Sequence, residues 1–359
     1  MLHLGYNCSM TDQAFMQRAL DLAKLGLGHV SPNPMVGCVI MHNNQIIGEG
    51  WHKKFGKAHA EVNAVNAVEN KALLKEAIFY ITLEPCSFHG KTPACSDLLI
   101  SINPPKVFVA SKDPNPRVSG RGIELLKDAG IAVDIGLLEA EAMALNKRFF
   151  VTMRLKRPYI ILKWAQTSDG FLARTNYNSK WISNEHSRQL VHKWRTEEDA
   201  ILVGYNTVKY DDPQLTARDW QGRDPVKVII DPDLGLDNSY QVFNGNDNQV
   251  YVFNTKEEKH FANKINCMVN KSIFIADMLT RLEQDNIGSI LVEGGAKTLN
   301  NFIQLGLWDE ARIFTAETTF KEGIAAPLLD FAVDQKQNIM GDRLSIIYNP
   351  QTEKIWRRK

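Results

Sequence analysis

The sequence predicts a mixed α/β protein with two domains, on three observations. Short apolar, β-branched runs alternate with segments of helical periodicity along most of the chain, as in a sheet covered by helices. The length of 359 residues exceeds one ordinary domain of about 150 residues. A basic, aromatic stretch at 146–158 separates the two alternating blocks, and it suits either a solvated helix end or a phosphate contact. We therefore predict domains at 1–150 and 151–359, with the boundary near Val151.

The first block begins with a helix. Thr11 is a suitable N-cap, and apolar residues follow it on one helical face. A second helix is expected to open at His59 and Glu61, because valines recur at three-residue steps through the alanine-rich segment 58–68. Strands are expected at 35–41, 78–83, 106–110 and 133–135.

The second block repeats the alternation. Strands are expected at 159–163, 200–203, 226–230, 249–253, 289–292 and 312–315. After the fifth of these strands, Gly294 and Gly295 lead into another helix. Paired glycines at such a turn let backbone N–H groups approach a phosphate. The G-x-G-x-x-G fingerprint is absent, so the residues alone favour a simple tight turn.

One group of residues in the first block carries recognisable chemistry. His59, Cys86 and Cys95 are zinc-type ligands, and Glu61 adds a carboxylate two residues after the histidine. A catalytic zinc has three protein ligands and leaves its fourth position to water. Glu61 would then move protons between that water and a leaving amine. The H-x-E and P-C pattern is the signature of zinc nucleobase deaminases.

The environment of the ligands is also predictable. Cys86 is expected where a strand gives way to a helix N-terminus, whose N–H groups favour a thiolate. A structural zinc is the alternative, and His89 is then the one candidate for a fourth ligand. Of the five cysteines, Cys8, Cys38 and Cys267 are expected to be free thiols.

Composition excludes several classes of protein. The 44% hydrophobic and 23% charged residues are those of a soluble globular protein. Lys+Arg 42 against Asp+Glu 41 gives a net charge of +1, so no basic field favours nucleic acid. No apolar stretch approaches the roughly 20 residues that span a bilayer, and the start lacks the pattern of a signal peptide. We expect a cytoplasmic homo-oligomer that acts on a small molecule.

Several further motifs point to a known family. They are S-P-N-P-M-V-G at 31–37, G-W-H at 50–52 leading to H-A-E-V at 59–62, T-L-E-P-C-S at 82–87, and D-P-N-P at 113–116 with G-R-G at 120–122. Together they resemble the bifunctional deaminase-reductases of riboflavin biosynthesis, and the resemblance covers nearly the whole chain. The eight residues between Cys86 and Cys95 match that family. Cytidine and tRNA adenosine deaminases have C-x-x-C instead.

The resemblance implies a cytidine-deaminase-like N-terminal domain. This domain would remove an amino group by hydrolysis from a phosphorylated pyrimidine, diaminohydroxyphosphoribosylaminopyrimidine. Zn²⁺ would be held by the two cysteines and His59, with Glu61 as the catalytic proton carrier. Asn33 and His52 match positions that line the substrate pocket. Their simpler interpretations are a turn residue and the end of a strand.

The C-terminal domain resembles the family's reductase, which has a dihydrofolate-reductase-like fold and uses NADPH to reduce the ribosyl group to ribityl. The implied substrate contacts are Ser179, Arg195, Leu215, Arg218 and Glu293. The implied cofactor contacts are Ala165, Trp181, Thr207 and Asp211, with Gly295, Ala296, Lys297, Thr298, Leu299, Asn300 and Asn301 at the cofactor phosphates.

Some of these implied roles have a physical rationale. Arginine presents a fixed fork of donors, so Arg195 and Arg218 are credible phosphate ligands, although each alone is more ordinarily an ion-pair partner. Pro232 stands where the family commonly has serine, which removes a hydroxyl and an N–H. Lys163 and Asp211 are candidate proton donors.

Two other functions remain possible at this point. One is a zinc deaminase of nucleic-acid bases fused to a binding module, which the near-neutral charge and the long cysteine loop disfavour. The other is a zinc-stabilised binding protein, which Glu61 and the missing fourth ligand disfavour.

Overall fold

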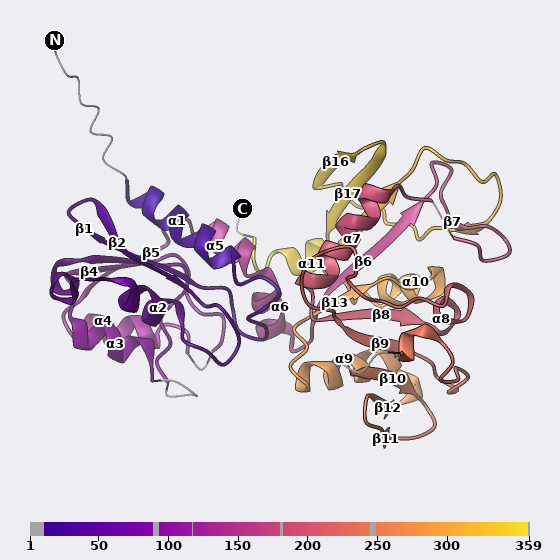
Figure 1. Cartoon of the computed structure of the whole chain (residues 1–359), viewed down its shortest axis with the longest axis horizontal. Helices are drawn as coiled ribbons and strands as arrows, with labels where there is room; N and C mark the ends of the chain where they lie inside the picture. The colour runs from indigo at the N-terminus through magenta and orange to yellow at the C-terminus, as the bar shows by residue number, and fades with distance from the viewer. Residues whose placement is uncertain (1–10, 89–92, 117, 180–181, 245–248, 358–359) are drawn as a thin grey trace, which may run out of the picture. The chain divides into compact units, whose positions relative to one another are not determined.

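The computed structural model describes residues 11–88, 93–116, 118–179, 182–244 and 249–357 (Figure 1). The chain divides into two compact units. The first runs to Arg154 and takes in the chain end from Ile355, and the second spans Leu155–Lys354. The predicted boundary at Val151 lies inside helix α6 (Lys147–Leu155), just before this division. The α/β prediction is confirmed for both units.

The first unit contains a five-stranded sheet in the order β2-β1-β3-β4-β5. Its strands are β1 (Gly37–His42), β2 (Gln45–Trp51), β3 (Ile78–Ile81), β4 (Lys106–Val109) and β5 (Ala132–Ile135). Strand β1 runs antiparallel to β2 and β3, whereas β3, β4 and β5 are parallel. The sequence analysis missed β2, whose two glycines interrupt its apolar pattern.

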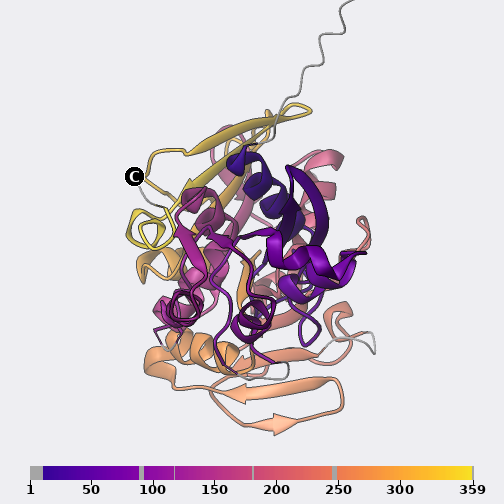
Figure 2. The ribbon, with the colours of Figure 1, turned by 90° about the vertical axis from the view of Figure 1, so that its left-hand side faces the viewer.

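Helices cover both faces of this sheet. Side chains on successive strand residues point to opposite sides, and apolar residues on both sides have to be buried. Val39, Tyr80 and Phe108 pack on the face of α1, while Ile40 and Phe79 pack on the face of α2. The helices are α1 (Asp12–Lys24), α2 (Ala60–Ala67), α3 (Cys95–Ile102), α4 (Arg121–Asp128) and α5 (Glu139–Leu145), with a 3₁₀ turn at Lys71–Glu76. Helix α1, in indigo, can be followed in Figure 2. Thr11 caps it as predicted, because its hydroxyl accepts the Ala14 N–H.

The second unit is built on a ten-stranded sheet in the order β11-β12-β10-β9-β8-β13-β6-β14-β17-β16. The strands from β12 to β14 in this order are parallel, and the outer pairs are antiparallel. The strands are β6 (Tyr159–Gln166), β8 (Ala200–Gly204), β9 (Val226–Ile230), β10 (Val250–Asn254), β11 (Lys259–His260), β12 (Lys264–Met268), β13 (Ser289–Val292), β14 (Glu310–Thr315), β16 (Gln335–Ile339) and β17 (Asp342–Tyr348). A separate pair joins β7 (Phe171–Ala173) and β15 (Ile324–Ala325).

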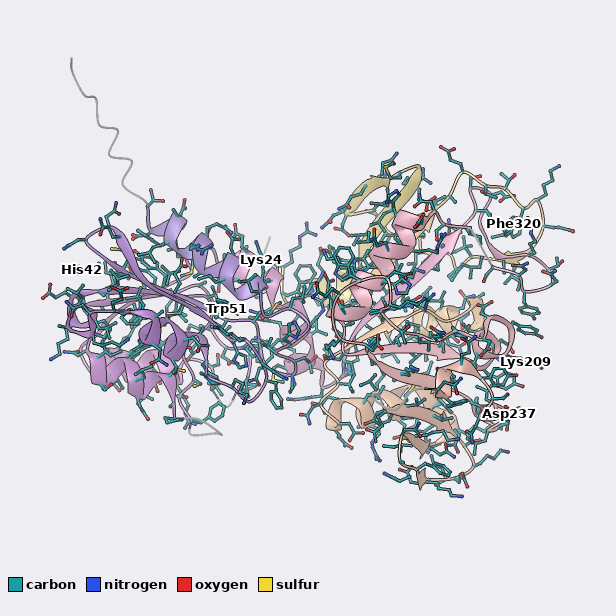
Figure 3. All side chains as sticks on the ribbon, in the orientation of Figure 1. Lys24, His42, Trp51, Lys209, Asp237 and Phe320 are labelled. Carbon is teal, nitrogen blue, oxygen red and sulfur yellow. The ribbon has the colours of Figure 1, made fainter. Side chains whose placement is uncertain are left out.

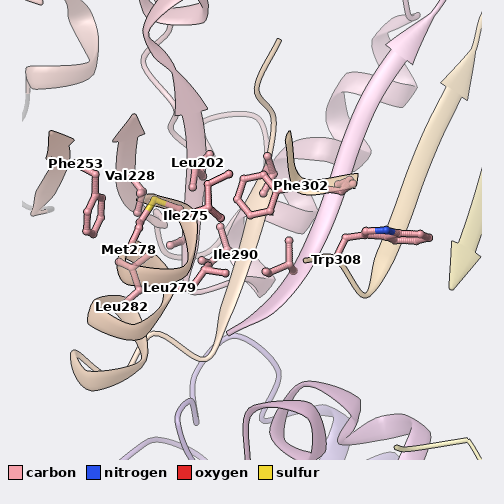
Figure 4. Close-up of a cluster of buried hydrophobic side chains, with 14 of the residues drawn as sticks. Leu202, Val228, Phe253, Ile275, Met278, Leu279, Leu282, Ile290, Phe302 and Trp308 are labelled. Carbon is pink, nitrogen blue, oxygen red and sulfur yellow. The ribbon is translucent and has the colours of Figure 1, made fainter. Parts of the chain in front are cut away.

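Helices also cover this second sheet. They are α7 (Glu185–Glu197), α8 (Tyr205–Asp211), α9 (Phe274–Gln284) and α10 (Ala296–Gln304). The unit also contains the short helix α11 (Pro350–Glu353) after β17, and 3₁₀ turns at Gln241–Phe243 and Lys271–Ile273. Figure 4 shows Met278 and Leu282 of α9 and Phe302 of α10 against Leu202 and Ile290 of the strands. Full burial of one such side chain contributes about 2 kcal/mol. This packing therefore fixes the strand ends from which the loops of the second unit begin.

Side chains fill the space between the sheets and their helices in both units (Figure 3). None of the helices in the described ranges is long and apolar enough to cross a bilayer.

Candidate active sites

Three metal-ligand side chains meet in the first unit. The ligand atoms of His59, Cys86 and Cys95 all lie within 4.8 Å of one another. His59 Nδ1 is 3.3 Å from Cys95 Sγ and 3.6 Å from Cys86 Sγ. Ligands of a shared tetrahedral zinc, at bond lengths of about 2.0 to 2.3 Å, are separated by about 3.5 Å. The separations and the N/S donor set therefore fit zinc, with Nδ1 as the histidine ligand atom.

Local folding places two of these ligands at helix starts and the third in a loop. His59 is the N-cap of α2, as the sequence predicts. The expectation for Cys86 is wrong: the helix begins nine residues later, with Cys95 as its first residue, because Cys86 lies in a loop after β3. A helix N–H still reaches the thiol, since Cys95 N–H donates to Cys86 Sγ at 3.2 Å. The hydrogen bond from the Cys95 side chain holds the pKa of the Cys86 thiol well below its usual value.

Glu61 lies in the first turn of α2 and is 3% exposed. Burial raises the pKa of its carboxyl, and the charge of Cys86 adds to this effect. A carboxyl beside a metal-ligand cluster whose pKa is raised takes up a proton more readily, which suits it to general acid-base chemistry. No fourth ligand joins the cluster among the described residues, and His89, the fourth-ligand candidate of the structural-zinc alternative, lies outside them.

Glu84 is a second buried carboxylate of this unit, and it has a structural task. Its two oxygens accept backbone N–H groups of Asp113, Gly120, Gly122 and Ile123 at 2.9 to 3.4 Å. A side chain at Gly122 would lie 2.1 Å from the carbonyl oxygen of the residue before Cys86. The D-P-N-P and G-R-G motifs are thus tied to the cysteine loop. The T-L-E-P-C-S motif at 82–87 includes Glu84, but nothing in the sequence indicated that its carboxylate accepts these hydrogen bonds.

Asn33 and His52 come together, although they are 19 positions apart in the sequence. Asn33 Nδ2 lies 3.2 Å from His52 Nε2, and His52 Nδ1 lies 3.1 Å from the Ala58 carbonyl oxygen. A carbonyl only accepts, so Nδ1 carries the proton and Nε2 accepts from the asparagine. Burial lowers the pKa of His52, which favours the neutral form of the ring. The His52 and His59 rings meet edge to face at 5.4 Å, so this pair borders the metal-ligand cluster.

The second unit holds a cleft of about 1540 Å³. Its walls begin at the carboxyl ends of β6, β13, β8, β9 and β10, which are neighbours in the sheet. This edge of a parallel sheet is where ligands bind in α/β folds. A pocket for one small ligand measures about 300 to 1000 Å³, so this cleft has room for two ligands. The predicted residues that line it are Ala165, Ser179, Arg195, Thr207, Asp211, Leu215, Arg218, Glu293, Gly295, Ala296, Lys297, Thr298 and Asn301.

A buried charge cluster lies at the β6–β13 end of this cleft. Arg195 Nε and Nη2 donate to the two Glu293 oxygens at 2.9 and 3.0 Å, and Lys163 Nζ is 3.7 Å from Glu293. Burial would raise the pKa of Glu293, but the Arg195 and Lys163 charges hold it down to about 2. Burial lowers the pKa of Lys163. Arg195 is therefore committed to an ion pair, and Arg218 is the more exposed cation of the predicted pair.

The glycine turn after β13 has a definite geometry. Gly295 is the N-cap of α10 with φ −67, and a Cβ there would meet only Thr207 Oγ1, at 3.6 Å. Its N–H donates to that hydroxyl at 3.1 Å. A Cβ on Gly294 would instead lie 2.7 Å from Thr298 Cβ. Gly294 is thus needed for packing, whereas Gly295 leaves the cleft open before a helix N-terminus.

Two of the predicted residues that the structure describes are not brought to the cleft. Leu299 is fully buried in the core, and Asn300 does not line the cavity. The backbone geometry of α10 turns these two positions away. Trp181 lies outside the described residues.

The structure also brings residues to the cleft that the sequence analysis missed, with no motif to indicate them. His192 borders it one helical turn before Arg195, and its Nε2 lies 3.1 Å from Asp219. Tyr177 and Tyr210 stack with ring centroids 4.3 Å apart, and Lys209, labelled in Figure 3, lies beside Tyr210 on α8.

Comparison with known proteins assigns both units. Residues 9–111 match the cytidine and deoxycytidylate deaminase zinc-binding region, and residues 158–320 match the RibD C-terminal domain. The riboflavin biosynthesis protein RibD of Aquifex aeolicus is 42% identical over 320 residues, covering 88% of this chain and 89% of the relative. The chain belongs to the RibD family.

Further relatives agree. RibD of Escherichia coli K12 is 35% identical over 86% of this chain and 88% of its own length. A solved structure from Thermotoga maritima has a TM-score of 0.86 at 37% identity and covers 94% of this chain and 98% of its own. A RibD structure from Acinetobacter baumannii has a TM-score of 0.86 at 35% identity, with coverage of 94% and 99%.

Membership of the RibD family confirms the predicted fold of both domains and the bifunctional assignment. The chain is an enzyme of riboflavin biosynthesis with a zinc-dependent deaminase domain and an NADPH-dependent reductase domain. The second unit is therefore a reductase domain, and this assignment is favoured over the alternative of a zinc deaminase of nucleic-acid bases fused to a binding module.

Proposed function

We propose that this chain carries out two successive steps on one phosphorylated pyrimidine. The Thermotoga maritima relative is described as a diaminohydroxyphosphoribosylaminopyrimidine deaminase and 5-amino-6-(5-phosphoribosylamino)uracil reductase. We assign deamination to residues 1–150 and reduction to residues 151–359. The observation that carries the proposal is the His59, Cys86 and Cys95 cluster with Glu61 beside it.

In the deaminase domain, a bound Zn²⁺ would supply an activated water at neutral pH. His59, Cys86 and Cys95 would hold the ion and leave one position open. Glu61 takes the proton of that water and delivers it to the leaving amine. Burial supports this role, because it raises the pKa of the carboxyl and so favours its protonated form.

Asn33 and His52 recognise the flat heterocycle beside this centre. His52 Nε2 holds the amide nitrogen of Asn33. The asparagine oxygen is therefore oriented to accept a hydrogen bond from an amino group of the pyrimidine. The neutral His52 ring fixes this amide direction, so its effect on the substrate passes through Asn33.

In the reductase domain, the bound NADPH supplies a hydride for the sugar carbon next to the pyrimidine-linked nitrogen. The open space before α10 fits the cofactor phosphates, since Gly295 and Lys297 line it at a helix N-terminus. Arg218 is the proposed ligand of the substrate phosphate. Glu293, held by Arg195, is positioned to accept hydrogen bonds from sugar hydroxyls.

Reduction also requires a proton. Hydride addition to the ring-opened sugar carbon leaves an electron pair on the attached nitrogen. Lys163 is the better of the two candidate donors, because burial lowers its pKa and thereby makes it a stronger acid. Asp211 already accepts a hydrogen bond from the Ser179 hydroxyl, at 3.3 Å, so it would position Ser179 instead.

The test uses purified full-length protein and the pyrimidine ribosylamine phosphate. We expect ammonia release without NADPH and, after its addition, stoichiometric NADPH oxidation. Glu61→Gln should keep its zinc while deamination falls by a factor on the order of 10² or more. Loss of zinc in this variant would make Glu61 a ligand, and absence of ammonia release from wild-type protein would contradict the assigned substrate.

We also propose a cytoplasmic location and a homo-oligomeric state. The absence of a described membrane-spanning helix is compatible with the first. Light scattering of the purified chain measures the second.

A further inference from the structure

The far end of the reductase cleft carries a second set of charges. The cleft follows the carboxyl ends of β6, β13, β8, β9 and β10, in that spatial order. Neighbouring strands are about 4.8 Å apart, so the edge from β6 to β10 spans roughly 19 Å. The Lys163, Arg195 and Glu293 cluster lies at one end. Asp231, after β9, and Lys256, after β10, line the other.

The orientation of a dinucleotide in this cleft follows from the proposed function, on which this inference rests. Its nicotinamide must lie near the substrate at the β6–β13 end. Its pyrophosphate fits the N-terminus of α10, which begins directly after β13. The adenosine half must therefore extend toward β9 and β10.

Two lysines border that end of the cleft. Lys256 follows β10, and Lys271 begins the 3₁₀ turn before α9. Both side chains are exposed. Lys256 Nζ is 3.2 Å from Asp233 Oδ1, in an ion pair whose partners are 56% and 81% exposed. For Lys271, no ion pair occurs within the described part of the chain. Both ammonium groups can therefore reach a ligand without leaving a buried partner unpaired.

The acidic groups of this region do not suit NADH. Sites for NADH commonly offer a carboxylate that accepts the adenosine ribose hydroxyls. Asp231 is the candidate by position, but its two oxygens already accept the N–H groups of Gly235 and Leu236, each at 3.0 Å. Asp233 is the other acid, and it faces Lys256.

Backbone donors are also scarce at this point. Pro232 has no N–H, and its carbonyl oxygen accepts both the N–H and the hydroxyl of Thr255, at 3.0 Å each. The backbone of Pro232 therefore contributes nothing to phosphate binding, which favours side-chain cations as the ligands at this end.

We propose that Lys256 and Lys271 form a phosphomonoester-binding subsite that selects a nicotinamide dinucleotide phosphorylated on its adenosine ribose. Asp233 is the counterion of Lys256 in the free protein, and the phosphate takes its place.

The test compares ligands that differ by this one phosphate. Fluorescence titration gives the Kd of NADPH and NADH, and calorimetry gives the Kd of adenosine 2′,5′-bisphosphate and adenosine 5′-monophosphate. We expect Lys256→Ala and Lys271→Ala each to weaken NADPH and the bisphosphate roughly tenfold, the loss of one charge-assisted contact. NADH and the monophosphate should keep their Kd within about twofold. Asp233→Asn should strengthen NADPH and leave NADH unchanged.

Lys259→Ala is the matched control, because Lys259 lies on β11, outside the cleft. Equal weakening of NADPH and NADH in the lysine variants, or no weakening of either, would overturn the subsite while leaving the reductase assignment intact. Wild-type protein that binds neither dinucleotide would overturn the reductase assignment as well.

Discussion

The zinc cluster and the reductase cleft use the chain in opposite ways. The cluster takes its ligands and its acid-base group from residues 59–95, within one compact stretch. The cleft draws on the carboxyl ends of five strands spread over residues 159–254 and 289–292. A metal requires particular ligand types at short distances, whereas a dinucleotide is held largely by backbone and by scattered side chains. The zinc cluster therefore leaves a recognisable motif in the sequence, whereas the reductase cleft does not.

The largest effect should come from removing one zinc ligand, and it tests whether the two sites are independent. Cys86→Ser replaces a thiolate with a hydroxyl, which is a much poorer zinc ligand. We expect zinc to be lost and deamination to fall to background, while NADPH-dependent reduction of the already deaminated intermediate is unchanged. Metal analysis and separate assays of the two steps measure this.

Cys38→Ala is the matched control, because Cys38 is a buried cysteine on β1 of the same unit, outside the cluster. It should keep both zinc and deamination. A folded Cys86→Ser protein without reductase activity would contradict the independence of the two sites.

The charge cluster of the cleft should give the next largest effect. Glu293→Gln leaves Arg195 and Lys163 buried without their partner, so we expect a loss of about 3 to 5 kcal/mol at pH 7. The depressed pKa of Glu293, about 2 against an ordinary 4.5, stabilises the fold at pH values above 4.5. This contribution, about 3 kcal/mol, is lost as the pH falls through 4.5 toward 2. The difference between wild type and variant should therefore shrink on acidification.

Urea unfolding at pH 7, 5 and 3.5 measures this prediction. Tryptophan fluorescence reports mainly on the second unit, because five of the seven tryptophans lie between Leu155 and Lys354. A destabilisation that does not change with pH would show that the carboxylate charge is not responsible.

The same contrast explains what could be predicted from the sequence. The helix at His59 and the six predicted strands of the second block are present, because periodic apolar residues report burial directly. Strand β16 was missed because it is an edge strand with mostly exposed polar residues. Strand β17 was missed because Asp342, Arg343 and Ser345 interrupt its apolar run. The sequence did not predict that α3 begins only at Cys95. The length of the loop before this helix depends on tertiary contacts, such as the hydrogen bond from the Gly122 N–H to Glu84.

Predictions for the site differ for a similar reason. The residue types and spacing of the zinc ligands are recognisable in the sequence, so the sequence analysis identified these residues. The ion pair between Arg195 and Glu293 joins residues 98 positions apart, and no local pattern indicates it. Leu299 shows the opposite error. The resemblance assigned the whole segment 295–301 to the cofactor, whereas a helix presents only one of its faces to the cleft, and Leu299 is buried in the core.

A smaller effect should come from substitution of Glu84, which supports the loop that contains Cys86 without contacting the metal ligands. Glu84→Gln replaces an acceptor-only carboxylate with an amide whose NH₂ group faces backbone donors. We expect the deaminase domain to lose about 1.5 to 3 kcal/mol of stability and to release zinc faster. Chelator-driven zinc release measures the rate. The exposed Glu124→Gln on α4 is the control and should change stability by less than about 0.5 kcal/mol. Equal behaviour of the two variants would show that the Glu84 contacts contribute little.

The smallest structural effect should come from the paired glycines, which separate packing from binding within one turn. A methyl group at Gly294 would lie 2.7 Å from Thr298 Cβ, so Gly294→Ala should cost about 1 to 3 kcal/mol of stability. Gly295 has φ −67 and an open Cβ position, so Gly295→Ala should change stability by less than about 1 kcal/mol.

The methyl group of Gly295→Ala nevertheless enters the space assigned to the cofactor phosphates, and Gly295→Val fills more of that space. NADPH affinity should fall progressively from glycine to alanine to valine, while zinc content and deamination stay constant. Cofactor titration with circular dichroism on the same samples measures both quantities. Unchanged NADPH affinity in a folded Gly295→Val protein would place the cofactor phosphates elsewhere in the cleft.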